Sequence, residues 1–477
     1  MAGGLKEIGC VRLMGVIDAI LVAGNEDITF KGISTDSRTV QEGQLFWALR
    51  GERFDGHDFV EKALTQGAVG AVVEEGQAGR FSRMSATILA VRDTLYALGE
   101  LARWWRKEHQ VMVGAITGSV GKTTTKEMAA GILSIGHETL KTEGNFNNLI
   151  GLPLTLLRLE KRHGRAVVEL GMNRPGEIAR LTQIAEPHVG VITEVGIAHL
   201  EGLGSLLGVA RAKLEMAQEM RSDGSLVING DNEMLRDMAA QYGRSMLTFG
   251  LGRDNDVKAV DVRERSEGGS SFTLVYGDLQ CMVNLVVPGL HNVMNGLAAA
   301  GLCIAMGERL DAIRQGLEAF TGLRGRFEIV RLGSRVTLVD DTYNANPVSL
   351  RAALDGVKGM VHSGKGLIVG LGDMLELGEE SERAHMEAGA WVGELRPKLF
   401  VCIGRYAENM AEGALGSGMA RQNVALANDT NEMADRIEAC LRKGDVILIK
   451  GSRKVGLDKV REMLVQRMGQ ASGEKGI

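Results

Sequence analysis

The stretch VMVGAITGSVGKTTTKEMAAGIL, residues 111–133, decides the fold class of this chain. Its apolar start, 111–115, is typical of a buried strand, and 126–133 has a helical pattern. Between them, Gly118 and Gly121 let backbone N–H groups turn inward around phosphate oxygens, and the helix N-terminus adds a partial positive charge. Strand, glycine loop and helix in this order predict an α/β domain that binds a nucleoside triphosphate.

The residues that end this loop support the same chemistry. Lys122 can reach the β- and γ-phosphates of ATP, and the Thr123 hydroxyl can ligate Mg²⁺. The match to the general P-loop pattern is imperfect, because Ile116 stands where the first glycine is expected and Gly118 comes two positions later. A glycine turn without a ligand is the alternative. The strand before the loop and GKTTT after it disfavour that alternative.

The alternation of strand and helix continues on both sides of the loop. AVVELG, VGVITEV and SLVING are β-rich runs, each followed by a helical pattern, which predicts a parallel central sheet. Residues 257–287 alternate polar and apolar side chains as a hairpin does. Short apolar runs around helices precede the loop at 27–108. After the connection 321–326, the runs VTLVDD, GLIVGLG, KLFVCIG and DVILIKG alternate with helices again.

This organisation and the length of 477 residues predict three α/β domains, because such a chain is too long for one hydrophobic core. We predict a small α/β substrate domain at 1–109 and a central P-loop domain with a parallel sheet at 110–322. A doubly wound, Rossmann-like domain is predicted at 323–477. With 44% hydrophobic and 24% charged residues, the composition suits a soluble globular enzyme.

Charge, cysteine content and apolar runs disfavour several other classes of protein. A net charge of −5 supplies no global basic field, so we expect no nucleic-acid partner. Five scattered cysteines form neither a CxxC pair nor a disulfide framework, which favours the reducing cytoplasm. The N-terminus lacks the order of a signal peptide, and the most apolar later stretch, 285–306, is interrupted by Pro288, His291, Asn292 and Asn295. We therefore expect no membrane span.

Seven further motifs follow the glycine loop in order. They are EGNFNNLIGLPLTLL (143–157), ELGMNRPGEI (169–178), ITEVGIAHLEGLGS (192–205), GLHNVMNGLAAA (289–300), GRFEI (325–329), DDTYNANPVS (340–349) and LGDMLELGEES (371–381). Together with the loop TGSVGKTTTKE they resemble the Mur ligase family over most of the chain. They are most similar to the branch that joins D-alanyl-D-alanine to UDP-N-acetylmuramoyl-tripeptide.

The resemblance implies an ATP-dependent peptide ligase that forms a C–N bond in peptidoglycan synthesis, and so acts in cell wall biogenesis, cell shape and cell division. The tripeptide carboxylate would attack the γ-phosphorus of ATP to give an acyl phosphate. The amine of the dipeptide would then expel phosphate, leaving the UDP-muramoyl-pentapeptide with ADP and phosphate. We expect the chain to act as a monomer.

Three alternatives predict different outcomes. A sibling ligase, MurE or folylpolyglutamate synthase, would share the ATP chemistry but differ in the acceptor or the amine, and the lack of a DNPR-type run disfavours MurE. A nucleotide-gated binding protein would turn over no substrate, and the intact Glu169, His199 and Lys213 disfavour it. A simple P-loop kinase would release a phosphorylated product, and the second doubly wound unit disfavours it.

For ATP and its metal ions, the resemblance implies ligands from the second and third domains. It implies ATP contacts at Gly118, Ser119, Val120, Gly121, Lys122, Thr123, Thr124, Asn295, Arg326 and Asp341. Thr123 and Glu169 would hold one Mg²⁺, and His199 would help to hold a second; Mn²⁺ is expected to substitute for both. Lys213 aligns with the lysine that the family carbamylates with CO₂, and its carbamate would support the second metal. The expected catalytic residues are Lys122, His199, Lys213 and Arg326.

Without the resemblance, several of these residues have ordinary explanations. His199 suits a hydrogen-bonded loop histidine, and Lys213 suits an exposed helix lysine that pairs with a glutamate. Asn292 and Asn295 suit helix caps. Arg326 and Asp341 suit an interdomain ion pair.

The resemblance also implies substrate contacts. Ser37 and Arg38 would contact the uridine diphosphate, because hydroxyls and a guanidinium suit a diphosphate. The sugar or the tripeptide would be contacted by Thr142, Asn145, Asn147, Asn148, Asn173 and Arg174. The incoming dipeptide would be held by Tyr343, Asn344, Asn346, Lys450, Ser452 and Arg453. Polar turns and loop caps are the alternatives for these residues.

Overall fold

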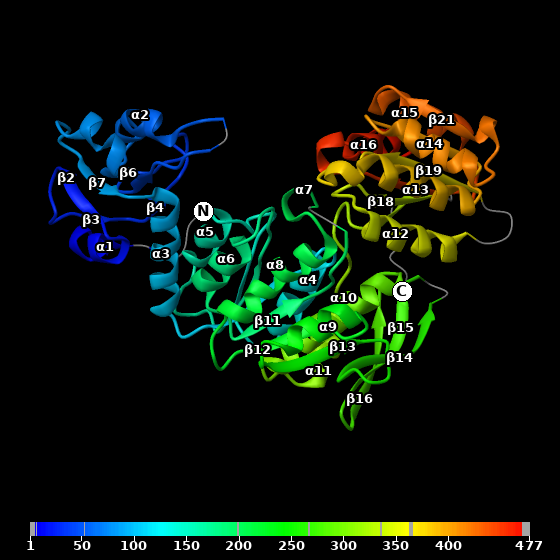
Figure 1. Cartoon of the computed structure of the whole chain (residues 1–477), viewed down its shortest axis with the longest axis horizontal. Coiled ribbons are helices and arrows are strands. Elements are labelled where there is room, and N and C mark those ends of the chain that lie inside the picture. The colour runs from blue at the N-terminus through cyan, green and yellow to red at the C-terminus, as the bar shows by residue number, and fades with distance from the viewer. Residues whose placement is uncertain are drawn as a thin grey trace.

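The computed structural model describes residues 5, 7–51, 53–197, 200–265, 268–333, 336–361 and 366–469. Figure 1 shows three α/β bodies in chain order, from blue through green to red. Each body contains a large sheet with parallel strand pairs. The chain is therefore a three-domain α/β protein, as the sequence predicts. Within these ranges, no helix combines the length and apolar character needed to cross a membrane.

The first domain is built on a five-stranded sheet in the order β2-β7-β6-β5-β4. Strand β2 is antiparallel to β7, and the other neighbours are parallel. A two-stranded sheet pairs β1 with β3. The strands are β1 (Ile8–Gly9), β2 (Ile20–Ala23), β3 (Thr29–Phe30), β4 (Ile33–Ser34), β5 (Leu45–Trp47), β6 (Gly70–Glu74) and β7 (Thr87–Val91), and the helices are α1 (Cys10–Ile17), α2 (Val60–Thr65) and α3 (Thr94–Lys107).

The central domain has a nine-stranded sheet in the order β16-β15-β14-β13-β12-β11-β8-β10-β9. The segment predicted as a hairpin adds β15 and β16 to this sheet in antiparallel fashion. The strands are β8 (Met112–Thr117), β9 (Thr139–Lys141), β10 (Arg165–Glu169), β11 (Val189–Ile192), β12 (Ser225–Asn229), β13 (Ser245–Gly250), β14 (Val257–Glu264), β15 (Ser270–Tyr276) and β16 (Leu279–Leu285). The helices are α4 (Lys122–Leu133), α5 (Gly151–Leu156), α6 (Glu177–Ala185), α7 (Leu200–Leu203), α8 (Leu206–Glu219), α9 (Glu233–Ala240), α10 (Leu290–Ala305) and α11 (Leu310–Glu318).

Strand β8 lies between β10 and β11 and is parallel to both. Glu169, the last residue of β10, is in register with Ile116, and Ile192 at the end of β11 is in register with Thr117. The carboxyl ends of the three strands therefore meet at one edge of the sheet. The chain leaves β8 between its two neighbours, and such a switch point is where open α/β sheets bind ligands.

The third domain has a six-stranded sheet in the order β17-β18-β22-β19-β20-β21, parallel except for β17. Apolar clusters cover both faces of the sheet, which suits a doubly wound unit. The strands are β17 (Glu328–Leu332), β18 (Val336–Asp341), β19 (Leu367–Gly372), β20 (Leu399–Ile403), β21 (Val424–Ala427) and β22 (Val446–Lys450). The helices are α12 (Pro347–Met360), α13 (Ser381–Glu394), α14 (Ala407–Gly416), α15 (Thr430–Cys440) and α16 (Asp458–Met468).

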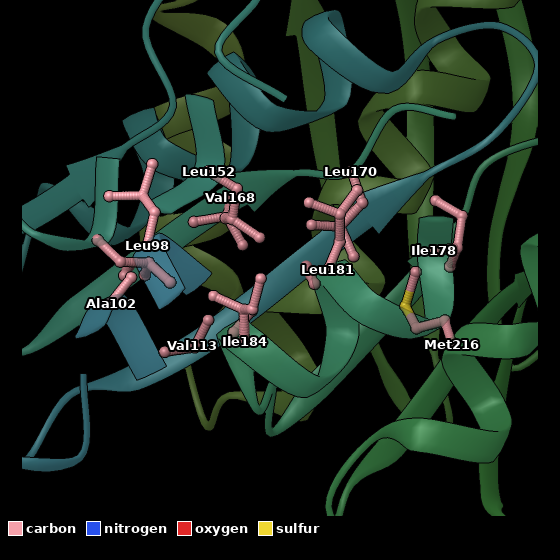
Figure 2. Close-up of a cluster of buried hydrophobic side chains, with 14 of the residues drawn as sticks. Leu98, Ala102, Val113, Leu152, Val168, Leu170, Ile178, Leu181, Ile184 and Met216 are labelled. Carbon is pink, nitrogen blue, oxygen red and sulfur yellow. The ribbon is translucent and has the colours of Figure 1, made fainter. Parts of the chain in front are cut away.

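One apolar cluster joins the first domain to the central one. Helix α3 begins at the Asp93 cap, whose carboxylate accepts from the Tyr96 amide at 2.8 Å. Its buried side chains Leu98 and Ala102 lie in the same cluster as Ile184 of α6. Figure 2 shows Leu98 and Ala102 at the left of this cluster. Burying a leucine of this kind contributes roughly 1.5–3 kcal/mol. The two domains thus share a core at α3.

Candidate active site

A cleft of about 750 Å³ lies where the three domains meet. The central domain lines it with the glycine loop, the loop after β9 and the segment after β10, and the third domain adds residues near Arg326. The predicted residues that line this cleft are Ser119, Val120, Gly121, Lys122, Thr123, Thr124, Asn145, Asn147, Asn148, Glu169, Asn173, Asn295, Arg326, Asp341, Tyr343, Asn344, Asn346 and Lys450. Segments more than 300 residues apart in the sequence therefore form one site.

The glycines of the loop are required by backbone conformation and by space. Gly121 is the N-cap of α4 with φ +84°, and Gly118 has φ +153°. A Cβ atom on Gly118 would lie 1.9 Å from the Thr193 hydroxyl oxygen, and one on Gly121 would lie 2.2 Å from Asn295 Oδ1. Both positions therefore favour glycine, and the start of α4 points its free N–H groups into the cleft.

The end of β11 braces the loop from behind. The Ser119 hydroxyl donates to the Gly196 carbonyl and accepts from the Gly196 amide, both at 3.0 Å, and the Ser119 amide donates to the Glu194 carbonyl at 2.8 Å. The Thr193 hydroxyl donates to the Val120 carbonyl at 2.5 Å. The Ser119 side chain therefore faces β11 and not the phosphate position. Sequence reasoning missed the role of Thr193, although it stands at the end of a recognised strand.

Lys122 curls back over the loop, and its ammonium donates to the Gly118 carbonyl at 2.8 Å. Burial lowers the pKa of Lys122, and the carboxylate of Glu169 opposes this shift while the Arg326 guanidinium adds to it. Two cationic side chains from different domains thus approach the same space. A polyanion such as a triphosphate would relieve their repulsion.

Thr123 and Glu169 form the site that fits a divalent cation. The Thr123 hydroxyl donates to Glu169 Oε2 at 2.8 Å, and Glu169 is only 3% exposed. Both side chains offer oxygen atoms, which Mg²⁺ prefers, and Mg²⁺ in nucleotide sites takes its remaining ligands from phosphates and water. The donor set beside the start of α4 therefore fits Mg²⁺ bound together with a nucleotide.

Lys213 lies on α8 and is 1% exposed. Burial holds the pKa of Lys213 well below the usual lysine value, and nearby Lys122 lowers it further. Among the residues that the structure describes, none forms a hydrogen bond or ion pair with its ammonium. The alternative of an exposed lysine paired with a glutamate is therefore wrong. His199, which was predicted as a metal ligand, lies outside the described residues.

The start of α10 presents the two predicted asparagines differently. The helix begins at Leu290 with Gly289 as its N-cap, so neither asparagine caps it. The Asn292 amide donates to the Pro288 carbonyl at 2.7 Å, whereas Asn295 faces the glycine loop at Gly121. Asn295 is thus the asparagine placed to contact a nucleotide bound to the loop.

In the third domain, Tyr343 lies between two guanidinium groups. Arg326 stacks over its ring at 4.0 Å and Arg453 at 5.1 Å. Asp341 instead pairs with Lys450 at 2.6 Å, within the same domain. The described ion pair of Asp341 therefore lies within its own domain, and not between domains as the alternative had it. Within the described part of the chain, no carboxylate pairs with Arg326, which leaves its charge directed at the cleft.

Asn346 connects the third domain with the glycine loop. It caps α12 with a reciprocal capping box to Ser349, and its side-chain amide reaches the Ser119 carbonyl at 3.5 Å. Asn344 accepts from the Ala345 amide through its side chain, and its carbonyl accepts from Lys450 at 2.9 Å. These contacts hold the DDTYNANPVS segment against the cleft.

Six of the predicted substrate residues do not line the cleft: Ser37, Arg38, Thr142, Arg174, Ser452 and Arg453. The Arg38 side chain is 77% exposed and pairs with Asp36 at 2.7 Å, and Ser37 beside it is buried. Thr142 is fully buried, and its hydroxyl accepts from the Glu169 amide at 3.0 Å. From the first domain, Arg50 lines the cleft instead. Sequence reasoning missed Arg50, which lies just before the stretch FDGHDF at residues 54–59.

Comparison with known proteins agrees with this geometry. Three family models match successive parts of the chain: the Mur ligase family, catalytic domain, at residues 29–106, the Mur ligase middle domain at 116–303, and the Mur ligase, glutamate ligase domain, at 325–453. The middle-domain match begins inside the glycine-loop strand, and the third match begins at Gly325 in the linker to the third domain.

Relatives and solved structures match almost the whole chain. The UDP-N-acetylmuramoyl-tripeptide–D-alanyl-D-alanine ligase of Haemophilus influenzae is 36% identical over 464 residues, which covers 95% of this chain and 97% of that protein. A crystal structure of MurF from Acinetobacter baumannii has a TM-score of 0.88 at 33% identity and covers 97% of this chain and 100% of that one. The MurF ligase of Thermotoga maritima in complex with ADP has a TM-score of 0.82 at 30% identity, with 91% and 97% covered. The chain belongs to the Mur ligase family.

Proposed function

We propose that this chain joins D-alanyl-D-alanine to UDP-N-acetylmuramoyl-tripeptide at the cost of ATP, giving the UDP-muramoyl-pentapeptide, ADP and phosphate. The observation that carries the proposal is the single cleft in which Lys122, the Thr123–Glu169 pair and Arg326 converge from two domains. Relatives that cover more than nine tenths of the chain are named for this reaction. The cytoplasm is the proposed compartment, because all five cysteines are free thiols.

The residues of the cleft support transfer of the γ-phosphoryl group to the tripeptide carboxylate. Lys122 and Arg326 neutralise the charge that develops on the transferring group, and the amides at the start of α4 hold the remaining phosphates. Asn346 brings the third domain against the loop. Closure of this domain on the bound substrates keeps water from the acyl phosphate until the amine of the dipeptide attacks it.

Thr123 and Glu169 are the residues that would hold Mg²⁺ in this reaction. When bound, the ion screens phosphate charge and orients the γ-phosphoryl group. A second ion is proposed with Lys213 and, as the family resemblance implies, His199 among its ligands.

Carbamylation of Lys213 is part of this proposal. The amine of Lys213 is buried without a described counter-charge, and burial lowers its pKa, which favours the neutral, nucleophilic form over the ammonium. Addition of CO₂ forms an N–C bond, releases one proton and leaves a carbamate anion. The anion offers the second metal an oxygen ligand that an amine cannot supply. Labelled ¹³C-bicarbonate should give a carbamate carbon signal that Lys213→Met lacks.

Substrate contacts are proposed for the polar residues of the cleft wall. Asn145, Asn148, Asn173 and Arg50 face the space on the acceptor side, and Asn344 and Lys450 face it from the third domain. Ser37, Arg38 and Thr142 remain weaker proposals, because none of them lines the cleft in this structure.

Product analysis tests the proposed function. Purified protein is incubated with ATP, Mg²⁺, bicarbonate, D-alanyl-D-alanine and UDP-muramoyl-tripeptides that carry lysine or diaminopimelate at position three. The expected result is phosphate release matched by a pentapeptide mass, and loss of both in Lys122→Ala. ATP turnover without a pentapeptide would reject this function in favour of a sibling ligase.

A further inference from the structure

Both oxygens of the Glu169 carboxylate are held by side chains of other elements. Oε2 accepts from the Thr123 hydroxyl, and Oε1 accepts from the side-chain amide of Asn147 at 2.8 Å. Thr123 belongs to α4, while Asn147 belongs to the loop between β9 and α5. A carboxylate that is 3% exposed therefore depends on two donors for its orientation.

Asn147 is itself held in place. Its backbone carbonyl accepts from the Gly171 backbone amide at 2.8 Å, and its backbone N–H donates to the Asn145 backbone carbonyl at 2.7 Å. A Cβ atom on Gly171 would lie 2.9 Å from Asn147 Cγ, so the asparagine side chain lies flat against this glycine. Few rotamers of Asn147 fit this space, and the observed one points its amide at Glu169.

A buried lysine fixes the start of the same loop to the phosphate-binding helix. Lys126 is fully buried, pairs with Glu127 at 2.8 Å and donates to the Thr142 carbonyl at 2.6 Å. The Thr142 hydroxyl in turn accepts from the Glu169 amide. At its start, the loop is bonded through Thr142 to both α4 and β10. At its end, it is bonded through Asn147 to β10.

We propose that Asn147 is a positioning residue: it holds Glu169 toward the divalent cation and so ties the loop of residues 142–148 to the metal site. A ligating carboxylate needs such a partner, and removing one typically weakens metal binding 10- to 100-fold. This assigns to Asn147 a role that differs from direct contact with the sugar or peptide. The proposal for Asn147 rests on the proposed function in one respect: it assumes that the protein binds Mg²⁺ together with a nucleotide.

Binding of ADP, measured by calorimetry with Mg²⁺ and with EDTA, tests the proposal without muramoyl substrate. The quantity compared is the factor by which Mg²⁺ tightens ADP binding. In Asn147→Ala we expect this factor to fall about tenfold, with ADP affinity in EDTA unchanged. Glu143→Gln is the matched control, because the exposed Glu143 of the same loop pairs with Arg158 at 2.8 Å and does not line the cleft; it should keep the wild-type factor.

A double-mutant cycle separates positioning from contact. If Asn147 acts through Glu169, Asn147→Ala should have no further effect on the Mg²⁺ factor in a Glu169→Gln background. An unchanged Mg²⁺ factor with a raised KM for the muramoyl-tripeptide would overturn the proposal and make Asn147 a substrate contact. Weaker ADP binding in EDTA would also overturn it, because the substitution would then disturb the glycine loop. If the protein makes no pentapeptide, the proposed function fails while this binding measurement can still be interpreted.

Discussion

The junction between the first and central domains is apolar and continuous, whereas the junction between the central and third domains is made by a few separate side-chain contacts. At the first, Leu98, Leu101 and Ala102 of α3 are buried in a cluster that also contains side chains of both sheets. At the second, the two domains have separate clusters, and a few side chains make the contact, among them Ile197, which packs against the third-domain core, and the His291–Phe327 ring pair. A large apolar interface resists relative motion, while a small one permits it.

Polar bonds reinforce the first junction. Arg106 is buried and donates to the carbonyls of Ala185 at 3.0 Å and Glu186 at 3.1 Å. Arg103 pairs with the Glu186 carboxylate at 2.8 Å, and the Trp105 indole donates to the Leu159 carbonyl at 3.1 Å. Helix α3 therefore behaves as part of both domains, although the proposed boundary at 109/110 falls after it.

The second junction depends on a few residues around a glycine-containing linker. Gly322 and Gly325 have φ of +97° and +71°. His291 of α10 meets Phe327 edge-on with ring centres 4.9 Å apart, and Asn346 reaches the Ser119 carbonyl. We expect the third domain to move relative to the other two more readily than those two move relative to each other. The proposed boundary at 322/323 lies in this linker.

Arg326→Ala should have the largest effect, because this residue brings the charge of the moving domain to the phosphates. We expect kcat for pentapeptide formation to fall about 10³-fold with little change in unfolding free energy. Arg324→Ala is the control, since Arg324 forms an exposed pair with Glu462. Equal losses in the two variants would show that the linker as a whole, and not the Arg326 charge, is responsible.

Leu98→Ala tests whether the first two domains share one core. Removing this buried side chain should cost about 2–5 kcal/mol. Hydrogen exchange measured by mass spectrometry should report faster exchange in both the first and central domains. Leu354→Ala, in the core of the third domain, should accelerate exchange in that domain only. An effect of Leu98→Ala confined to the first domain would contradict the comparison of the junctions.

His291 should make the second junction sensitive to acid. Burial lowers the pKa of His291 to about 4 from the usual 6.5, with Asp341 opposing the shift and Lys450 adding to it. Between these values the unfolded chain binds a proton that the folded chain does not, so stability should fall as the pH drops from about 6.5 to about 4. The loss is at most ~3 kcal/mol. Urea unfolding at several pH values should show that the unfolding free energy of His291→Gln depends less on pH than that of the wild type. Equal pH dependence in the two proteins would assign the acid sensitivity to other groups.

Gly325→Ala should have the smallest effect. A side chain at positive φ costs about 1 kcal/mol, and Gly325 has φ +71°. We expect that loss of unfolding free energy in the third domain, together with a change in kcat if the hinge conformation controls closure. Gly416→Ala in α14 is the control, because a Cβ atom there meets no atom within 4 Å and alanine favours the helix. Equal changes in unfolding free energy and kcat in the two variants would show that the conformation of Gly325 has no special role.

Much of the site could be predicted because its signals are local. The glycine loop lies in one short stretch, and Glu169 is the last residue of an apolar strand, so their type and place follow from neighbouring residues. The substrate residues of the first domain were harder. Arg38 and Arg50 are both polar-loop arginines in the sequence, yet only Arg50 lines the cleft. Their different placement depends on how the first domain packs against the central domain through α3.

By itself, the sequence determined the α/β class, the order of the three domains, the phosphate loop and the family resemblance, because periodicity, glycines and motifs act over a few residues. Only the tertiary structure decided that Thr123 meets Glu169 across 46 residues, that Lys213 is buried without a described partner, and that Asn147 holds the Glu169 carboxylate. Those contacts follow from strand order and domain packing. Burial and distance are properties of the whole fold, and no short segment encodes them.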